Sequence, residues 1–535
     1  MTFILFLISL LTRLLFLYFG YPSITNDEAD YFLNSYLLAK TGSDIHLQKF
    51  FLTSGILNAT SSVPVYLGSI FFFFLDKSVI AGRLPYVLLN SLTPVIFYLI
   101  INKLTKNKMF SLIGFIVFNF SPWFSYLSSF SAIDSPTAMF FYLSSIYILL
   151  TSLKRKWKYA LFILFSFLSF NSYMGIKTIF FLLLLIALIA EAIYQKRKLD
   201  YKKIVKYSYT SLALFAVFFI ISWVSPSSSF FKNRLKEKLL PLNMNFISLN
   251  VDRLRDISKG PFFIRKIIHN KLTVTFKFFV ERYVQGFNPY FLFVKGDPDP
   301  LYGTNYFGLF YIFDMIFLLL GIIFFRRVLG KNTIAALPFV LLLFTAPLIV
   351  GLMLDPAAIS LRSFLSITGY VFFISCGVYL TSSFYLKNEK IIIGVVGAIY
   401  LISFLYFFFL YQTTIKFSSG DQWHMYEKVL INKLAEMNYK RKNQKVIVYV
   451  NEPRPTLLQY LYYEEKNPYV IKKLITGNND TIGNIQFSHL CPQEKIPNSI
   501  QIMNSERCPV NEKVFKSEVL VAPEFGIGSK YLLLY

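Results

Sequence analysis

Long apolar runs, repeated along most of the chain, restrict what this sequence can fold into more than any other feature. About eleven runs occur before residue 412, and most are close to the roughly 20 residues that an α-helix needs to cross a bilayer. They cover residues 3–19, 79–101, 109–127, 135–152, 158–172, 175–194, 206–224, 310–326, 333–352, 364–382 and 390–411. The sequence therefore predicts an α-helical polytopic membrane protein. The first run lacks a basic leader and a small-residue cleavage site, so we expect a retained anchor.

Composition agrees with this class. Of the 535 residues, 55% are hydrophobic and only 16% are charged, whereas about a quarter of a soluble domain is charged. The net charge of +25 suits anionic membrane lipids, and a chain with so many spans is a poor partner for nucleic acid. The 3 cysteines and 4 histidines are scattered, so the spacing indicates no metal site.

Basic residues in the short connections predict the orientation. The connections fall on one side if the N-terminus is cytoplasmic and if the short apolar segment 63–75 is a juxtamembrane helix rather than a span. They contain Lys103, Lys106, Lys108, Lys154, Arg155, Lys156, Lys158, Lys196, Arg197, Lys198, Arg326, Arg327, Lys331, Lys387 and Lys390. We therefore expect a plasma-membrane protein whose loops 20–78 and 225–309 and whose C-terminus are extracytoplasmic.

The outer loop 225–309 contains a predicted amphipathic helix, residues 262–287. Its apolar residues recur at helical spacing and alternate with Lys and Arg. Two readings stay open: the helix rests on lipid headgroups, or it borders a groove for a phosphate-bearing lipid.

The composition changes after residue 411, which predicts two domains, 1–412 in the membrane and 413–535 outside it. The second domain is expected to be a small α/β domain, with strands at 445–450 and 519–521 and a helix at 456–465. Cys491 and Cys508 either form a disulfide in the oxidising exterior or remain free thiols. Cys376, inside a span, is assigned to packing.

Several charged residues are predicted to gather at the outer ends of spans. Acids and arginines at one membrane face suit acid–base chemistry beside an anionic leaving group. The candidates are Asp27, Glu28, Arg83, Asp134, Lys177, Asp297 and Arg362. Structural alternatives remain for most of them: Asn26 or Asp27 could cap a helix that includes Glu28, Asp134 could cap its own helix, and the three basic residues could be interfacial anchors.

The order of these features resembles the polyprenyl-phosphate-dependent glycosyltransferases of the C-type membrane fold (GT-C), such as protein O-mannosyltransferases and the lipid A aminoarabinose transferase. The resemblance covers roughly residues 1–412. The matching elements are Asp27-Glu28 with Tyr31, Gly42-Ser43-Asp44, Arg83-Leu84-Pro85, Asp134, the stretch Phe291 to Asp297, and the stretch Pro356 to Arg362. Val63 stands before Pro64, where the aminoarabinose enzyme has Lys, which argues against lipid A as acceptor and against an aminoarabinose donor.

The resemblance implies an inverting transfer of a sugar, a mannose-like hexose or a pentose, from polyprenyl phosphate to a hydroxyl of a protein, lipid or envelope glycan. Asp27 would act as general base, Glu28 would orient it, and Asp134 would position a substrate. Arg83 and Arg362 would offset the phosphate charge. Tyr31, Lys177 and Asp297 complete the expected substrate site. No cofactor is required, although a divalent cation between Asp27, Asp134 and the phosphate is compatible with the pattern.

Three other functions are weighed against this enzyme. A polysaccharide ligase or polymerase is its nearest rival. A transporter or flippase of lipid-linked saccharide would show internal repeats and polar residues near the bilayer midplane, whereas here the ionisable residues gather at the ends of spans. An inactive scaffold would tolerate replacement of Asp27.

Overall fold

The computed structural model describes residues 1–44, 61–131, 133–197, 199–224, 236–355, 357–386, 388–440, 444–477, 480–492, 494, 496–508, 517–522 and 527–534. They divide into two compact units. The first unit comprises Met1–Tyr18 and Tyr86–Tyr411, and the second comprises Phe19–Pro85 and Gln412–Tyr535. Residues 19–85, which composition assigns to the membrane domain, thus group with the C-terminal segment.

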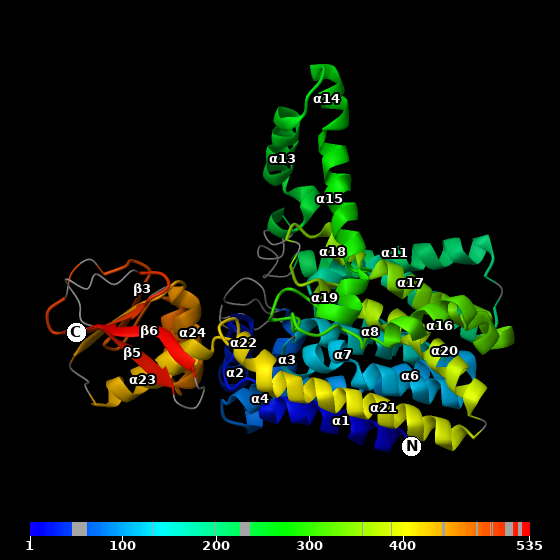
Figure 1. Cartoon of the computed structure of the whole chain (residues 1–535), viewed down its shortest axis with the longest axis horizontal. Coiled ribbons are helices and arrows are strands. Elements are labelled where there is room, and N and C mark those ends of the chain that lie inside the picture. The colour runs from blue at the N-terminus through cyan, green and yellow to red at the C-terminus, as the bar shows by residue number, and fades with distance from the viewer. Residues whose placement is uncertain are drawn as a thin grey trace. The chain divides into compact units, whose positions relative to one another are not determined.

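The first unit is helical (Figure 1). The helix α4 (Val79–Ser91) begins in the second unit and ends in the first. The other α-helices of the first unit are α1 (Thr2–Phe19), α5 (Thr93–Thr105), α6 (Lys108–Phe120), α7 (Pro122–Tyr126), α8 (Asp134–Leu149), α9 (Arg155–Phe170), α10 (Phe180–Tyr194), α11 (Tyr201–Val224), α13 (Met244–Ile257), α14 (Phe262–Ile268), α15 (Lys271–Gln285), α16 (Asp314–Leu329), α17 (Leu337–Thr345), α18 (Leu348–Leu352), α19 (Ile359–Arg362), α20 (Ile367–Tyr385) and α21 (Glu389–Leu410). Short 3₁₀ or π segments are η1 (Leu127–Ser131), η2 (Gly175–Thr178), η3 (Leu240–Leu242), η4 (Phe291–Lys295), η5 (Gly330–Ala336), η6 (Phe364–Ser366) and η7 (Tyr411–Ile415).

Six helical stretches within the described residues are long and apolar enough to cross a membrane. A seventh qualifies if Lys108–Phe120 and Pro122–Ser129, which meet at a bend of 54°, count as one span. They are Thr2–Phe19, Val79–Thr105, Tyr201–Val224, Asp314–Leu352, Phe364–Tyr385 and Glu389–Ser418. The prediction of a multi-span helical membrane protein is therefore confirmed. The number of eleven spans and their orientation remain predictions, because several expected spans form shorter helices.

A buried arginine ties α1 to α6 within the first unit. Arg13 is fully buried, and its Nη1 donates to Asn119 Oδ1 at 2.6 Å and to the Ser9 carbonyl at 3.0 Å. Its guanidinium also lies 4.4 Å from the centre of the Phe124 ring. A charge in an apolar segment is tolerated only when it is partnered in this way, so Arg13 fixes how α1 packs.

The predicted continuous helix 262–287 is wrong, because it is interrupted at His269 and Asn270. Asn270 caps α15, accepting hydrogen bonds from the amides of Leu272 and Thr273. In Figure 1, α13 and α15 lie side by side and α14 joins them at one end. Whether these helices contact a phosphate-bearing lipid stays a prediction.

The second unit combines helices with one mixed sheet. Its helices are α2 (Asn26–Thr41), α3 (Ser62–Phe74), α22 (Lys416–Ser418), α23 (Met425–Lys440), α24 (Pro453–Tyr463) and α25 (Pro468–Thr476). Its strands are β1 (Lys445–Tyr449), β2 (Thr481–Ile482), β3 (Ile485–Ser488), β4 (Ser499–Asn504), β5 (Ser517–Ala522) and β6 (Ile527–Leu534). The helix predicted at 63–75 and the strands and helix predicted in the C-terminal domain are confirmed within a few residues.

The sheet has the strand order β2-β3-β1-β4-β6-β5. The central strand β1 pairs in parallel with β3 on one side and β4 on the other, whereas β6 runs antiparallel to β4. Four of the five residues of β1 are buried, as expected for a strand whose two faces are both covered. The chain therefore leaves β1 toward β3 and later returns to add β4 on the opposite side.

A disulfide joins Cys491 to Cys508, so the second of the two alternatives, free thiols, is excluded. Cys508 is buried beside Ile447, Tyr449 and Met503. The third cysteine, Cys376, is a buried free thiol, as predicted.

Breaking this disulfide is expected to lower the free energy of unfolding by about 3 kcal/mol, the chain-entropy value for a loop of this length. The bond closes a sequence separation of 17 residues. Chemical unfolding in mild detergent, with and without reductant, measures the change. The double variant Cys491→Ser, Cys508→Ser is the control, because reductant should produce no further loss in it. An equal response of both proteins to reductant would contradict the expectation.

Candidate functional site

The N-terminus of α2 is built around a reciprocal cap. Thr25 accepts a hydrogen bond from the Glu28 amide at 3.1 Å, and Glu28 Oε2 accepts one from the Thr25 amide at 2.9 Å. The cap is therefore Thr25, and the expected caps Asn26 and Asp27 were placed one or two residues too late. A capping box of this kind fixes where the chain enters the helix. Asp27 lies inside the box and its side chain is exposed.

Glu28 also forms a buried ion pair with Arg83. Arg83 Nε donates to Glu28 Oε1 at 2.6 Å, and Nη2 donates to Oε2 at 2.9 Å. The same guanidinium donates to the carbonyls of Tyr21 at 2.7 Å and Ser23 at 2.8 Å. Arg83 is only 1% exposed, so the interpretation as an interfacial anchor is wrong. The geometry matches a bidentate Arg–carboxylate pair that shapes the segment 21–28.

Aromatic side chains support the same segment from the other part of the second unit. The Tyr21 and Trp423 rings stack with centroids 4.2 Å apart and an angle of 6° between planes, and the Tyr21 hydroxyl lies 2.6 Å from Ser419 Oγ. Tyr31, one turn beyond Asp27, is buried, and its hydroxyl accepts a hydrogen bond from the Ser61 amide at 3.1 Å. Asp27 thus emerges from a segment held by ionic, hydrogen-bonding and aromatic contacts.

Three further predicted residues gather in the first unit, around residues 360–362. The buried Asp297 accepts a hydrogen bond from the Ser360 amide at 2.7 Å. Ser135, the neighbour of Asp134, donates to the Leu361 carbonyl at 2.9 Å. Asp134 is the first residue of α8 and not its cap. The sequence order could not show this gathering, because the three stretches are far apart in the chain.

Burial and charge distinguish these groups. Arg362 pairs with Asp355, whose Oδ2 lies 3.4 Å from Nη2. Although burial would raise the pKa of Asp355, the Ala357 amide and the charge of Arg362 lower it. Burial raises the pKa of Asp297 despite its hydrogen bonds to the amides of Ser360 and Asp299. Asp297 is therefore suited to holding backbone in place, and Arg362, partly exposed, to meeting a ligand.

Lys177 lies in η2 of the first unit. Its Nζ is 3.4 Å from Asn171 Oδ1 and 5.1 Å from the centre of the Phe170 ring. These neighbours leave both the anchor and the substrate-binding interpretations of Lys177 as predictions.

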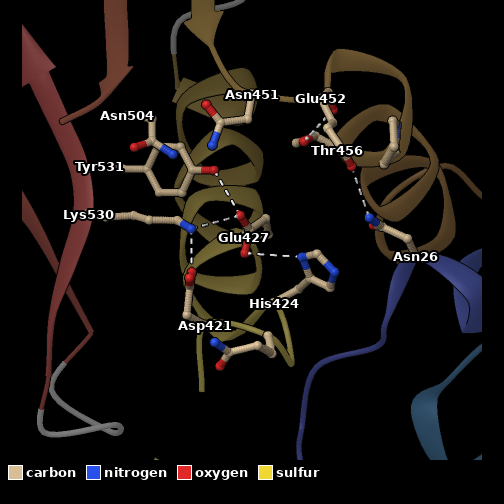
Figure 2. A pocket seen from close by; sticks show the side chains of 12 residues that line it. Asn26, Asp421, His424, Glu427, Asn451, Glu452, Thr456, Asn504, Lys530 and Tyr531 are labelled. Carbon is tan, nitrogen blue, oxygen red and sulfur yellow. Dashed lines mark hydrogen bonds and ion pairs between the residues drawn. The ribbon is translucent and has the colours of Figure 1, made fainter. Parts of the chain in front are cut away.

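A polar pocket in the second unit was missed by the sequence analysis (Figure 2). It has a volume of about 260 Å³ and is lined by Asn26, Asp421, Gln422, His424, Glu427, Asn451, Glu452, Pro455, Thr456, Asn504, Lys530 and Tyr531. These residues come from the start of α2, the segment around α23, the loop after β1, the start of α24, and strands β4 and β6. Asn451 follows the hydrophobic strand β1, and Asn504 is the last residue of β4. A polar residue at the end of a hydrophobic strand is the sequence signal that could have indicated the pocket.

An ion cluster forms one wall of the pocket. Lys530 Nζ pairs with Asp421 Oδ1 and lies 3.7 Å from Glu427 Oε1. The Tyr531 hydroxyl donates to Glu427 Oε1 at 3.1 Å, and His424 Nδ1 is 3.5 Å from Oε2. Figure 2 shows these side chains converging on Glu427 from β6 and from the turn before α23. The charged side chains of this wall are thus paired with one another.

We expect acid to weaken this cluster. Burial would raise the pKa of Glu427, but the hydrogen bond from His424 and the charges of His424 and Lys530 lower it below the ordinary 4.5. A carboxyl group whose pKa is lower in the folded than in the unfolded state stabilises the fold at pH values above its unfolded-state pKa. This stabilisation is lost as the pH falls through the folded-state pKa. Glu427→Gln should therefore unfold at a lower temperature than the wild type at neutral pH, and the difference should narrow below pH 4.5. A difference that is independent of pH would contradict this.

Comparisons with known proteins give one kind of match. No protein-family model and no curated protein matches the chain. Among solved structures, it is similar to ArnT from Cupriavidus metallidurans bound to undecaprenyl phosphate, with a TM-score of 0.41, 9% identity, and coverage of 100% of this chain and 96% of that chain. The apo state of ArnT from the same organism gives a TM-score of 0.39 and 9% identity over 99% and 97%.

Proposed function

We propose that this protein is an inverting glycosyltransferase that moves a sugar from a polyprenyl-phosphate donor to a hydroxyl acceptor at a membrane surface. The observation that carries the proposal is the exposed carboxylate of Asp27, on a helix start that the buried Glu28–Arg83 pair fixes shortly after a membrane-length helix. A buried ion pair is an expensive way to shape a loop, which favours a functional reason for that shape. The resemblance in the sequence of residues 1–412 supplies the reaction class.

Asp27 is the proposed general base. It takes the proton of the acceptor hydroxyl while that oxygen bonds to the anomeric carbon, and the bond from this carbon to the phosphate oxygen breaks on the opposite side. The polyprenyl phosphate leaves and the anomeric configuration inverts. The N-terminus of α2 favours negative charge at Asp27, which keeps the carboxylate ready to accept a proton.

Glu28 and Arg83 are proposed as positioning residues. Arg83 makes at least four hydrogen bonds, two to Glu28 and two to backbone carbonyls, and a guanidinium has five N–H groups. The phosphate charge is therefore assigned to Arg362 rather than to Arg83. Asp134 and Lys177 are proposed to contact substrates. Tyr31 is proposed to hold the backbone near Asp27 through its contact with Ser61, and Asp297 the backbone near Arg362 through its contact with Ser360.

A transfer assay tests the proposal. Purified protein in detergent is supplied with radiolabelled polyprenyl-phosphate hexoses and pentoses, and with an extract of cell-envelope acceptors. Label that moves to an acceptor from one donor supports the enzyme and names the sugar. No transfer from any donor, together with movement of the labelled lipid across the bilayer in proteoliposomes, would instead indicate a flippase.

A further inference from the structure

We infer that the pocket of Figure 2 binds a saccharide, and that this saccharide carries the acceptor hydroxyl of the proposed transfer. The second half of this inference rests on the proposed function. The first half concerns binding alone, and it can be tested without any transfer.

The position of the pocket in the sheet is the first argument. Asn451 follows the carboxyl end of β1, and Asn504 ends β4. These two strands are parallel neighbours, and the chain leaves β1 in the opposite direction, toward β3. Crevices at the carboxyl ends of parallel strands where the strand order reverses are the usual ligand sites of open α/β sheets.

The lining is the second argument. Gln422 and Asn451 contribute carboxamides to the lining. Asn26, Asn504 and Thr456 also line it, but their side chains already form hydrogen bonds within the protein. Each carboxamide offers two donors and an acceptor, which matches hydroxyl groups that both donate and accept. Gln422 and Asn451 are exposed, so they can exchange water for ligand hydroxyls. The volume of about 260 Å³ lies just below the roughly 300–1,000 Å³ of sites for drug-sized ligands, which suits a single sugar unit.

The charged residues of the lining argue against anions and cationic peptides as ligands of the pocket. Asp421, Glu427 and Glu452 outnumber Lys530 in the lining, so a phosphate or another anion would be repelled. A cationic peptide would find these acids already engaged, because Lys530 pairs with Asp421 and Glu427, and Asn26 Nδ2 donates to Glu452 Oε2 at 3.3 Å. Among the described residues, no group of three or more His, Cys, Asp or Glu side chains could hold a metal ion. A neutral polyol remains.

The link to the reaction comes from Asn26. This residue lines the pocket, and Gln459 Nε2 donates to its Oδ1 at 2.9 Å. The next residue is Asp27, and consecutive Cα atoms are about 3.8 Å apart. Asp27 is not one of the residues that line the pocket, because consecutive residues of a helix point to different sides. A saccharide bound beside Asn26 would therefore present an acceptor hydroxyl to Asp27 by extending out of the pocket around the start of α2.

The experiment measures sugar binding by the full-length protein in detergent. Saturation-transfer NMR is recorded with methyl glycosides of common hexoses, N-acetylhexosamines and pentoses. We expect at least one glycoside to bind, and the double variant Gln422→Ala, Asn451→Ala to weaken its binding about tenfold or more, as expected for the loss of one or two hydrogen bonds. Gln444→Ala, which truncates a carboxamide of the same domain outside the pocket, is the control and should bind like the wild type.

Absence of binding by every glycoside, unchanged binding by the double variant, or binding of a lysine-rich peptide in place of glycosides would overturn the pocket assignment. The transfer assay then separates the two proposals. Transfer with an unchanged KM for the acceptor in the double variant leaves the enzyme standing and removes the pocket from it. A raised KM for the acceptor with an unchanged KM for the donor supports both.

Discussion

Replacing Arg83 with Met is expected to lower the free energy of unfolding by about 3–5 kcal/mol, the usual loss when one partner of a buried ion pair is removed. The change leaves the buried carboxylate of Glu28 without its cation and the carbonyls of Tyr21 and Ser23 without their donor. Glu28→Ala should have a similar effect, because it leaves the buried Arg83 guanidinium without its carboxylate and removes one of the two hydrogen bonds of the capping box. Chemical unfolding in detergent measures both losses.

A cycle and a control make this prediction specific. The double variant Glu28→Ala, Arg83→Met should lose less than the sum of the single losses, because the second change removes the charge that the first left unpaired. Lys203→Met is the matched control, because it breaks an exposed ion pair in which Lys203 Nζ lies 3.9 Å from Asp200 Oδ2. Exposed pairs of this kind contribute about 0–1 kcal/mol to the free energy of unfolding. An Arg83→Met protein as stable as Lys203→Met would show that the pair does not hold the segment.

Replacing Asp27 with Asn is expected to lower the rate of sugar transfer by about 100- to 10,000-fold, the usual contribution of general acid–base catalysis. Asn keeps the size of the side chain but cannot accept the acceptor proton at neutral pH. Because Asp27 is exposed and is not the helix cap, the variant should unfold at nearly the same denaturant concentration as the wild type. A large loss of stability would instead assign Asp27 to the structure of α2.

Local patterns in the sequence predicted the parts of the fold that depend on local physics. The β-branched run 445–450 predicted β1, and the apolar runs predicted a helical membrane protein, because burial of apolar surface leaves a periodic trace. The break at Asn270 was also readable, because an Asn directly before a stretch of apolar residues at helical spacing is a helix-start signal. The continuous apolar periodicity on both sides concealed it.

The pairing of distant residues could not be predicted in the same way. Glu28 and Arg83 are 55 residues apart, and no local pattern couples an acid at a helix start with an arginine in another helix. The pocket is a stronger example, since its lining extends from Asn26 to Tyr531. Its polar residues are unremarkable one by one, and only the sheet topology brings Asn504 and Tyr531 into the same register.

The most direct test of the account is the transfer rate of Asp27→Asn beside that of Asp252→Asn, each measured with the donor that the wild type uses. Asp252 is a matched control because its side chain is 69% exposed and belongs to a weak pair with Arg255. We expect the transfer rate of Asp27→Asn to be at least about 100-fold lower than that of the wild type and the rate of Asp252→Asn to be unchanged. Equal rates for the two variants would remove Asp27 from the mechanism and, with it, the proposed base.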